Sequence, residues 1–316
     1  MLRSLSLDGF KAFGKGKVQL RPFTVLIGPN GSGKTTIMEA IDILGRLVTG
    51  SIKDLLDIKG WEYGDLPHLR GATSEFSITA DLDLADESMQ WTVGLGTRRR
   101  PGISGELVRV MLPGTRGTGE TPITILKRRG RAMWRMAADG QSDTITQTLT
   151  SSWLSAIGDE DKDRFPQLVQ IAAWARGIRG YFFLDPLRLR SPSRGDGHEL
   201  GVNGEYLAPF LARLRERNRA AFSRVEHRVR KHYPRLVELH AVRKGNGMAH
   251  LEVTERWNGE TARFNARQVS DGLLRLIAVA AMHELPVTPS VLLLDEVEDG
   301  LHPTSWAVLS GCSRIW

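Results

Sequence analysis

The stretch that decides the fold is Phe23-Thr24-Val25-Leu26-Ile27-Gly28-Pro29-Asn30-Gly31-Ser32-Gly33-Lys34-Thr35. Its first five residues form a compact apolar run, which predicts a buried strand. The turn that follows matches the pattern G-x-x-x-x-G-K-[ST]. A helix is expected over 34–48, because apolar residues recur there on one helical face. Strand, glycine-rich turn and helix in this order are the context that a phosphate-binding P-loop requires.

The chemistry of phosphate binding explains the residue types in this turn. Gly31 and Gly33 let backbone N–H groups surround a phosphate without a clash from a Cβ atom. The helix N-terminus adds free N–H donors and partial positive charge. Lys34 is expected to reach the β- and γ-phosphates of ATP, and the Thr35 hydroxyl to ligate Mg²⁺. The predicted nucleotide-binding residues here are Gly28, Pro29, Asn30, Gly31, Ser32, Gly33, Lys34, Thr35 and Thr36. The motif alone does not separate kinases, GTPases and ATPases.

A pair of acids follows a second apolar strand, expected over 291–294. Ligands gather at the carboxyl ends of strands in α/β sheets, so a buried strand that ends in Asp295-Glu296 predicts a catalytic edge. Asp295 is expected to hold Mg²⁺ together with Thr35. Glu296 is placed to orient and deprotonate an attacking water. Glu296 and Lys34 are therefore the predicted catalytic residues, and hydrolysis is favoured over transfer to a second substrate.

The segment Ser270-Asp271-Gly272-Leu273-Leu274-Arg275 opens an apolar helix, expected over 271–285. Capping accounts for Ser270 and for an acid in the first turn. It does not account for Gly272, because glycine is costly inside a helix. A close approach by a phosphate would explain Gly272.

Composition narrows the class of protein. The chain has 316 residues, 41% hydrophobic and 25% charged, which is ordinary for a globular protein. No apolar run reaches the length of a membrane span, and the first residues lack the apolar core of a signal peptide. The only cysteine is Cys312, so no intrachain disulfide is possible. A cytoplasmic location follows as the expectation.

Charge leans toward polyanionic partners, with a formal net charge of +7 and a pI of about 9.7. The basic residues gather at 98–100, at 127–129 and along 213–231. A solvated face is the simplest interpretation of each cluster. They would form a nucleic-acid groove only if they shared one surface.

The rest of the chain reads as a β-layer followed by helices. Strands are expected over 4–7, 18–20, 75–84, 90–95, 107–112, 122–127 and 132–136, where apolar and polar residues alternate or turns rich in glycine intervene. Helices are expected over 149–157, 165–176 and 205–232. Further strands are expected over 181–184, 236–243 and 249–257.

The order GPNGSGKT, SDGLLR and LLLDEVEDGLHP resembles the ABC ATPase heads of SMC and RecF-like proteins. More narrowly, it is similar to the AAA-family ATPases related to the overcoming-lysogenization-defect (OLD) nucleases, as are the opening segment through 41 and the step at 201–207. The resemblance implies an α/β P-loop NTPase of the ABC-ATPase type, with a mixed twisted sheet, an antiparallel β-layer and a helical lid insertion. It implies a single head over 1–316, with the nucleotide-binding core from 1–84 and 236–316 and the insertion at about 85–235.

The resemblance also implies roles for individual residues. Ser270, Asp271 and Gly272 would cap the γ-phosphate of ATP held by the other subunit of a homodimer. Asp299 would be the D-loop acid, while His302 serves equally well as a turn residue before Pro303. Lys11 and Phe13 lie where the family's N-terminal turn approaches the nucleotide.

Two departures from the family pattern stand out. There is no Q-loop glutamine after the first helix, and His68 or Arg70 occupies that region. The chain ends at Trp316, before the strand that carries the family's switch histidine, so we expect a truncated form of a longer protein.

The function that these motifs favour is ATP binding and hydrolysis by an ATP-sandwiched dimer. DNA and a partner nuclease or effector protein, in repair or defence, are the expected partners. A nucleotide-binding regulatory head with little turnover is the alternative, favoured by the missing switch-histidine strand. A transporter ATPase subunit fits less well, because transporters carry Ser-Gly-Gly-Gln where this chain has Ser-Asp-Gly-Leu.

Overall fold

The computed structural model describes residues 1–68, 75–96, 102–112, 121–147, 149–181 and 184–296. The chain divides into two compact units, which are described separately. The N-terminal unit is Met1–Arg179 and the C-terminal unit is Gly180–Trp316. Asp299 and His302 lie outside the described residues, as do Arg70 and the basic cluster at 98–100.

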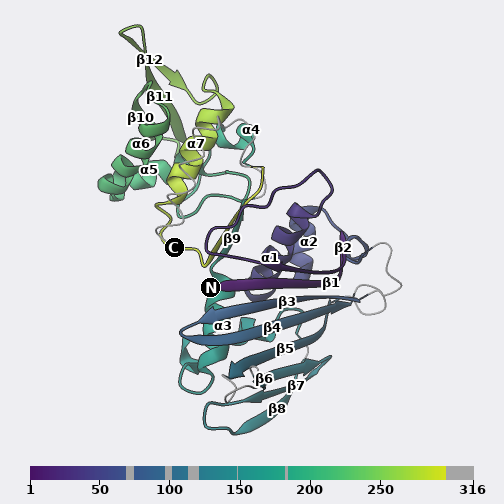
Figure 1. Cartoon of the computed structure of the whole chain (residues 1–316). Helices are drawn as coiled ribbons and strands as arrows, with labels where there is room; N and C mark the ends of the chain where they lie inside the picture. Colours follow the sequence, from purple (N-terminus) through teal and green to yellow (C-terminus); the bar gives the residue numbers. More distant parts are fainter. Residues whose placement is uncertain (69–74, 97–101, 113–120, 148, 182–183, 297–316) are drawn as a thin grey trace. The chain divides into compact units, whose positions relative to one another are not determined.

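An eight-stranded antiparallel sheet dominates the N-terminal unit (Figure 1). Its strand order is β2-β1-β3-β4-β5-β6-β7-β8. The strands are β1 (Leu2–Phe10), β2 (Phe13–Gln19), β3 (Glu75–Leu84), β4 (Glu87–Gly96), β5 (Gly102–Leu112), β6 (Thr121–Arg129), β7 (Ala132–Met136) and β8 (Ser142–Thr146). The expected antiparallel layer is confirmed. It begins with the first two strands, and β8 was not expected.

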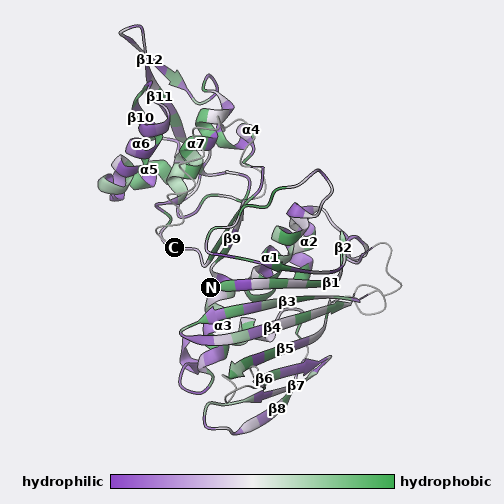
Figure 2. Cartoon of the chain, viewed as in Figure 1, coloured by the Kyte–Doolittle hydropathy of each residue, from purple (hydrophilic) through white to green (hydrophobic). Residues whose placement is uncertain are grey.

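Alternating side chains explain why these segments form one sheet with a buried face. In β3, Phe76, Ile78 and Leu82 are buried, while Ser77 and Thr79 on the other face are half-exposed. Figure 2 shows hydrophobic and hydrophilic residues alternating along the strands. The register continues the pattern, since Leu5 of β1 pairs with Ala80 of β3. The alternation of apolar and polar residues with a period of two therefore predicts both the strands and the face of each strand that is buried.

The helices of the N-terminal unit are α1 (Lys34–Thr49), α2 (Ile52–Lys59) and α3 (Pro166–Arg176), with 3₁₀ turns at Tyr63–Asp65, Trp153–Ala156 and Asp159–Asp161. The helix α1 packs against α3, and a Cβ on Gly45 would come 3.1 Å from the Ala175 carbonyl oxygen. The α2 helix, not expected, begins with a capping box between Ser51 and Asp54.

Two sequence expectations for this unit are wrong. The segment 23–27 is not a strand, and Phe23, Val25 and Ile27 are 50%, 63% and 90% exposed. A buried strand needs neighbouring strands, and the described residues supply none beside it. The helix expected over 149–157 is only the 3₁₀ turn Trp153–Ala156, because Glu106 accepts the Trp153 N–H at its start.

The C-terminal unit combines helices with a separate three-stranded sheet, ordered β10-β11-β12. Its elements are α4 (Pro186–Leu189), α5 (Leu207–Arg217), α6 (Arg219–His232), β10 (Leu236–Arg243), β11 (Ala249–Trp257), β12 (Glu260–Asn265), α7 (Asp271–Met282) and β13 (Val291–Leu294). One apolar core joins α5, α6, α7, β10 and β11. The bounds expected for β10, β11 and β13 are confirmed.

The structure corrects three details of this unit. The helix expected over 205–232 is broken at Asn218, whose side chain accepts from the Ala221 N–H at 3.0 Å and so starts α6. The strand expected over 181–184 meets β9 (Ile178–Tyr181), which begins earlier, and 182–183 lie outside the described residues. The strand β13 pairs with β9, and only its Leu293 is buried, so it is not the fully buried strand we expected. The expected mixed α/β class is confirmed, while the division into core and insertion stays a prediction.

Candidate functional site

The glycine-rich turn forms a loop at the N-terminus of α1. Gly31 and Gly33 have φ of +80° and +92°, a region that side-chain-bearing residues rarely adopt. Gly33 also has no room for a Cβ, which would lie 2.7 Å from Cε2 of the Phe13 ring. The turn between β1 and β2 therefore does reach the loop, through Phe13. Gly31 is favoured by its backbone conformation alone, whereas Gly33 is favoured by its backbone conformation and by the nearby Phe13 ring.

Lys34 lies in the mouth of this loop. Its Nζ donates to the carbonyl oxygens of Gly28 at 2.7 Å and Pro29 at 3.1 Å. An ammonium held on the carbonyls of the loop is in position to meet a phosphate that the same loop encloses. Thr35 is exposed at the first turn of α1, whereas Thr36 is buried. The structure thus gives Thr35 the accessible hydroxyl position and Thr36 a packing position.

A half-buried charged group lies behind the loop. Lys11 Nζ forms an ion pair with Glu39 Oε2 of α1 at 2.8 Å and sits 3.2 Å from the centre of the Trp61 ring. His68 Nδ1 is 2.6 Å from the Lys11 carbonyl oxygen. The ammonium of Lys11 is therefore engaged with α1, and His68 holds the backbone of the turn.

The two acids lie at the end of β13 in the C-terminal unit. The Asp295 N–H donates to the Tyr181 carbonyl at 3.1 Å, which continues the pairing with β9. Glu296 has a φ of +49° and its N–H donates to Asp295 Oδ1 at 3.1 Å. Glu296 is exposed and Asp295 half-buried. The two neighbouring carboxylates therefore differ in exposure to solvent.

A small hollow adjoins these acids, and sequence reasoning missed one of its members. Arg275, from the middle of α7, is 5% exposed, and its Nε donates to the Leu184 carbonyl at 3.1 Å. The residues that line the hollow are Tyr181, Leu184, Arg275, Val279, Leu294, Asp295 and Glu296. Arg275 of α7 and the two acids after β13 thus line the same hollow. The signal in the sequence was an arginine inside an otherwise apolar helical stretch.

The start of α7 bears out the local interpretation of Ser270. Its Oγ accepts from the Leu273 N–H at 3.3 Å, so Ser270 is the N-cap of the helix. Asp271 and Gly272 occupy the first turn. Asp271 forms an ion pair with Arg190, which directly follows α4. Sequence spacing gave no sign of this pair, since the two residues are 81 positions apart.

The candidate site residues therefore form two groups. The P-loop and Lys34 lie in the N-terminal unit, and the acids and Ser270-Asp271-Gly272 lie in the C-terminal unit. The described residues hold no set of three or more His, Cys, Asp or Glu side chains suited to a metal. Magnesium in nucleotide sites takes one or two protein ligands, phosphate oxygens and waters, so Thr35 and Asp295 fit the donor set that it needs.

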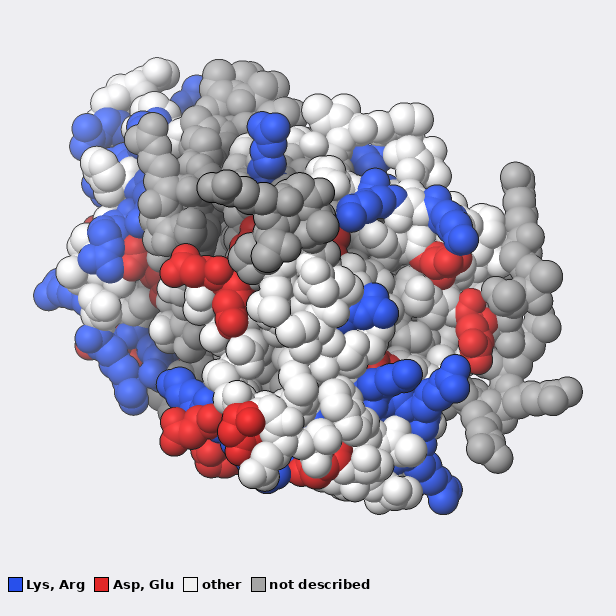
Figure 3. All heavy atoms as spheres, turned by 60° about the horizontal axis from the view of Figure 1, so that its bottom comes forward, with Lys and Arg blue, Asp and Glu red and all other residues white. Residues whose placement is uncertain are grey.

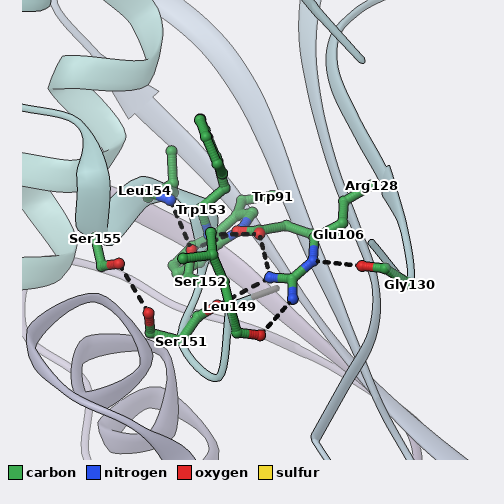
Figure 4. Close-up of polar contacts among 10 residues, drawn as sticks. All are labelled: Trp91, Glu106, Arg128, Gly130, Leu149, Ser151, Ser152, Trp153, Leu154 and Ser155. Carbon is green, nitrogen blue, oxygen red and sulfur yellow. Dashed lines mark hydrogen bonds and ion pairs between the residues drawn. The ribbon is translucent and has the colours of Figure 1, made fainter. Parts of the chain in front are cut away.

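In the two basic clusters that the structure describes, most side chains are exposed, as on the expected solvated faces, but some members are engaged within the fold. Arg128, in the cluster 127–129, is 5% exposed and donates to the carbonyls of Leu149, Ser151 and Gly130 (Figure 4). Its Nη1 lies 4.0 Å from Glu106 Oε2. Along α6, Arg224 and Arg228 both bind Glu284. On the face drawn in Figure 3, basic side chains are interspersed with acidic ones.

Glu106 is the centre of the network in Figure 4. It accepts from Trp91 Nε1 at 3.0 Å, Ser152 Oγ at 2.5 Å and the Trp153 N–H at 2.9 Å. Burial raises the pKa of Glu106, and these hydrogen bonds oppose the rise. The Ser152 N–H also donates to the Leu47 carbonyl of α1 at 2.8 Å. The network therefore ties the sheet to the helix that follows the P-loop.

Comparison with known proteins identifies the family. The family described as "AAA domain, putative AbiEii toxin, Type IV TA system" matches residues 150–309, and the one described as "AAA ATPase domain" matches residues 1–82. A segment of 44 residues is 43% identical to OLD nuclease of Thermus scotoductus (strain ATCC 700910 / SA-01); it covers 14% of this chain and 8% of that protein. The SMC head domain from Thermotoga maritima aligns with a TM-score of 0.42 and 16% identity over 99% of this chain and 85% of that chain.

Among the described residues, none of the helices combines the length and apolar character that a membrane crossing requires. The match to OLD nuclease spans a small part of that relative's length. The first family model, in contrast, spans half of this chain. The chain therefore belongs to that family of AAA domains, and a short segment of it is similar to OLD nuclease.

Proposed function

We propose that two copies of this chain bind two ATP molecules between them and hydrolyse them. The observation that carries the proposal is the loop 28–34. Two glycines with left-handed backbone lead into α1, and Lys34, the first residue of α1, reaches back to the loop carbonyl of Gly28. Such a loop suits the phosphates of a nucleotide. The family models, which match AAA domains at both ends of the chain, support the same substrate.

The chain's own residues would divide the work as follows. Lys34 leaves the Gly28 and Pro29 carbonyls to bind the β- and γ-phosphates. Thr35 and Asp295 would hold Mg²⁺, which neutralises charge that develops on the phosphates. Glu296 would take the proton of the attacking water, since it is exposed at the end of β13.

The proposed site is composite, because one copy would supply the P-loop and the other would supply Ser270-Asp271-Gly272. It therefore requires a dimer. Ser270-Asp271-Gly272 would cap the γ-phosphate bound to the partner's P-loop. The support is the capped N-terminus of α7, which offers N–H donors and an electropositive end to an anion. Dimerisation would then depend on ATP, and each site would need both copies.

Steady-state ATP hydrolysis by the purified chain tests this proposal. Glu296→Gln and Lys34→Ala should each lower the rate by about 100-fold or more, because each removes a group with a direct role. Glu260→Gln and Lys53→Ala are matched controls, as both residues are exposed and belong to neither group. Parental turnover that survives Glu296→Gln would overturn the assignment. ATP binding without turnover in the parent would instead indicate a regulatory head.

We further propose that the dimer acts on DNA, or with a partner nuclease, in repair or defence. The support is the net charge of +7 and the presence of eight Lys and Arg against two acids between 207 and 232. The matched family description names a toxin–antitoxin system, and the matched relative is named a nuclease. Duplex DNA should bind at 50 mM salt and weaken steeply at 200 mM. Absence of binding and of ATPase stimulation at low salt would remove DNA as the partner.

A further inference from the structure

Arg190 is held in place at the start of α7 by its own neighbours. It directly follows the single turn α4, whose Leu189 is 1% exposed. Gly204, with φ of +86°, lets the chain pass so close that a Cβ there would lie 2.4 Å from Leu189 Cδ2. The backbone before Arg190 is therefore fixed by tight packing, and its side chain extends from a rigid position.

The guanidinium of Arg190 has hydrogen-bonding capacity left over. Its Nη2 donates to Asp271 Oδ1. Its Nε is buried and has no hydrogen-bond partner among the described residues. A buried donor without an acceptor is costly, and such atoms are uncommon in native proteins. An enclosed donor beside the N-cap of α7 is suited to an acceptor that arrives with a ligand.

Asp271 explains why a cation is needed at this place. The N-terminus of α7 attracts an anion through its free N–H groups. A carboxylate in the first turn opposes that attraction, because it would repel a phosphate at close range. Arg190 neutralises Asp271 and adds the planar fork of donors that suits phosphate oxygens. Without Arg190 the predicted signature would present a negative charge to a negative ligand.

We propose that Arg190 contacts the γ-phosphate of the ATP bound to the partner copy, and so completes the composite site in trans. This inference rests on the proposed function, because it requires Ser270-Asp271-Gly272 to face the partner's nucleotide. In the free chain Arg190 is held by Asp271. When the γ-phosphate arrives, Nε and the terminal nitrogens donate to its oxygens, and Asp271 keeps the side chain aimed.

This arrangement makes dimerisation sensitive to the third phosphate. ADP lacks the γ-phosphate oxygens that Arg190 would bind, so the guanidinium would not stabilise a dimer of ADP-bound chains. The chain would then bind ADP and ATP through its own P-loop, and only ATP would join two copies. Arg190 thus converts occupancy of one P-loop into assembly with the other copy.

The test compares Arg190→Gln with Arg188→Gln, both in the Glu296→Gln background that retains ATP. Arg188 is an exposed arginine two residues earlier on the same turn, so it is a matched control. A fluorescent ATP analogue measures binding to the monomer, and light scattering measures ATP-dependent dimers. Arg190→Gln should leave monomer binding within about twofold and weaken dimerisation by about 100-fold or more. Arg188→Gln should change neither.

Three outcomes would overturn the inference. Arg190→Gln could dimerise with ATP as Arg188→Gln does, or it could lose nucleotide binding as a monomer, which would place Arg190 in its own subunit's site. Recovery in the double variant Arg190→Gln with Asp271→Asn would show that Arg190 only neutralises Asp271. If the Glu296→Gln chain itself forms no ATP-dependent dimer, the proposed function fails first. A dimer that forms equally with and without Arg190 refutes the inference alone.

Discussion

Replacement of Gly33 by alanine tests how the P-loop is built. The change forces a Cβ onto a residue with φ of +92°, and that atom would lie 2.7 Å and 2.9 Å from two carbons of the Phe13 ring. Gly31 offers a comparison at φ of +80°, because a Cβ there would meet nothing within 4 Å. Gly31→Ala therefore carries only the backbone cost, and Gly33→Ala carries the same cost plus a steric conflict.

The magnitudes follow from these two contributions. A left-handed backbone costs an alanine about 1–2 kcal/mol. Overpacking typically adds about 1–3 kcal/mol, and the lower end applies here because the half-exposed Phe13 ring can move. The free energy of unfolding should fall by about 1–2 kcal/mol in Gly31→Ala and by about 2–3 kcal/mol in Gly33→Ala.

Urea denaturation followed by tryptophan fluorescence measures both changes. The Phe13→Ala background isolates the steric part, since the conflicting ring is then absent. In that background the cost of Gly33→Ala should drop to the cost of Gly31→Ala, a coupling of about 1 kcal/mol. Equal costs of Gly33→Ala with and without the Phe13 ring would refute the contact between the β1–β2 turn and the loop.

Three further predictions concern buried charge and capping. The raised pKa of Glu106 means that its contribution to stability is present below its unfolded pKa of about 4.3 and is lost as pH rises through the folded pKa. From pH 4.5 to pH 8 the Tm of the parent should therefore fall relative to the Tm of Glu106→Gln. A difference in Tm that stays constant over this range would contradict the prediction. For Glu284, burial raises the pKa but hydrogen bonds from Arg224 and Arg228 lower it overall, so its contribution is present above about pH 4.3 and lost as pH falls through the folded pKa. Glu284→Gln should cost about 1 kcal/mol at pH 7 after solvent screening, and nothing at pH 3, in parallel thermal melts. Asn218→Ala should cost about 1 kcal/mol by removing the cap of α6, while Asn218→Asp keeps the cap and should cost little.

The parts of the fold that sequence predicts are those written in local patterns. The alternation along 75–84 gave β3 with its bounds and inward face, and the spacing of apolar residues after Lys34 gave α1. The motif at 28–35 predicted a glycine-rich turn, and in the structure its Gly31 and Gly33 adopt left-handed backbone. In each case the pattern that predicts the element lies within the few residues that form it.

The parts that failed depend on partners distant in sequence. The apolar run 23–27 indicates a preference for burial, but it does not say which strand would cover it. The amphipathic pattern continues across Asn218, so periodicity alone could not show the break, although asparagine is a good N-cap.

Buried charge was the other source of error. Arg128 looked like part of a solvated cluster, yet the period of two places it on the inward face with Leu126. That pattern could have identified it. Nothing in the spacing connects Arg190 with Asp271, or places Arg275 in the same hollow as the acids after β13, because both arrangements arise from the packing of the C-terminal unit.

The measurement that tests the central claim most directly is the specific rate of ATP hydrolysis as a function of protein concentration. A composite site needs two copies, so the rate per chain should rise with concentration at saturating ATP and level off once dimers predominate. Addition of the Lys34→Ala chain, which supplies Ser270-Asp271-Gly272 but no working P-loop, should raise the rate of a dilute parent. A rate per chain that stays constant across the whole range, and is unaffected by that addition, would contradict the account and place the complete site within one copy.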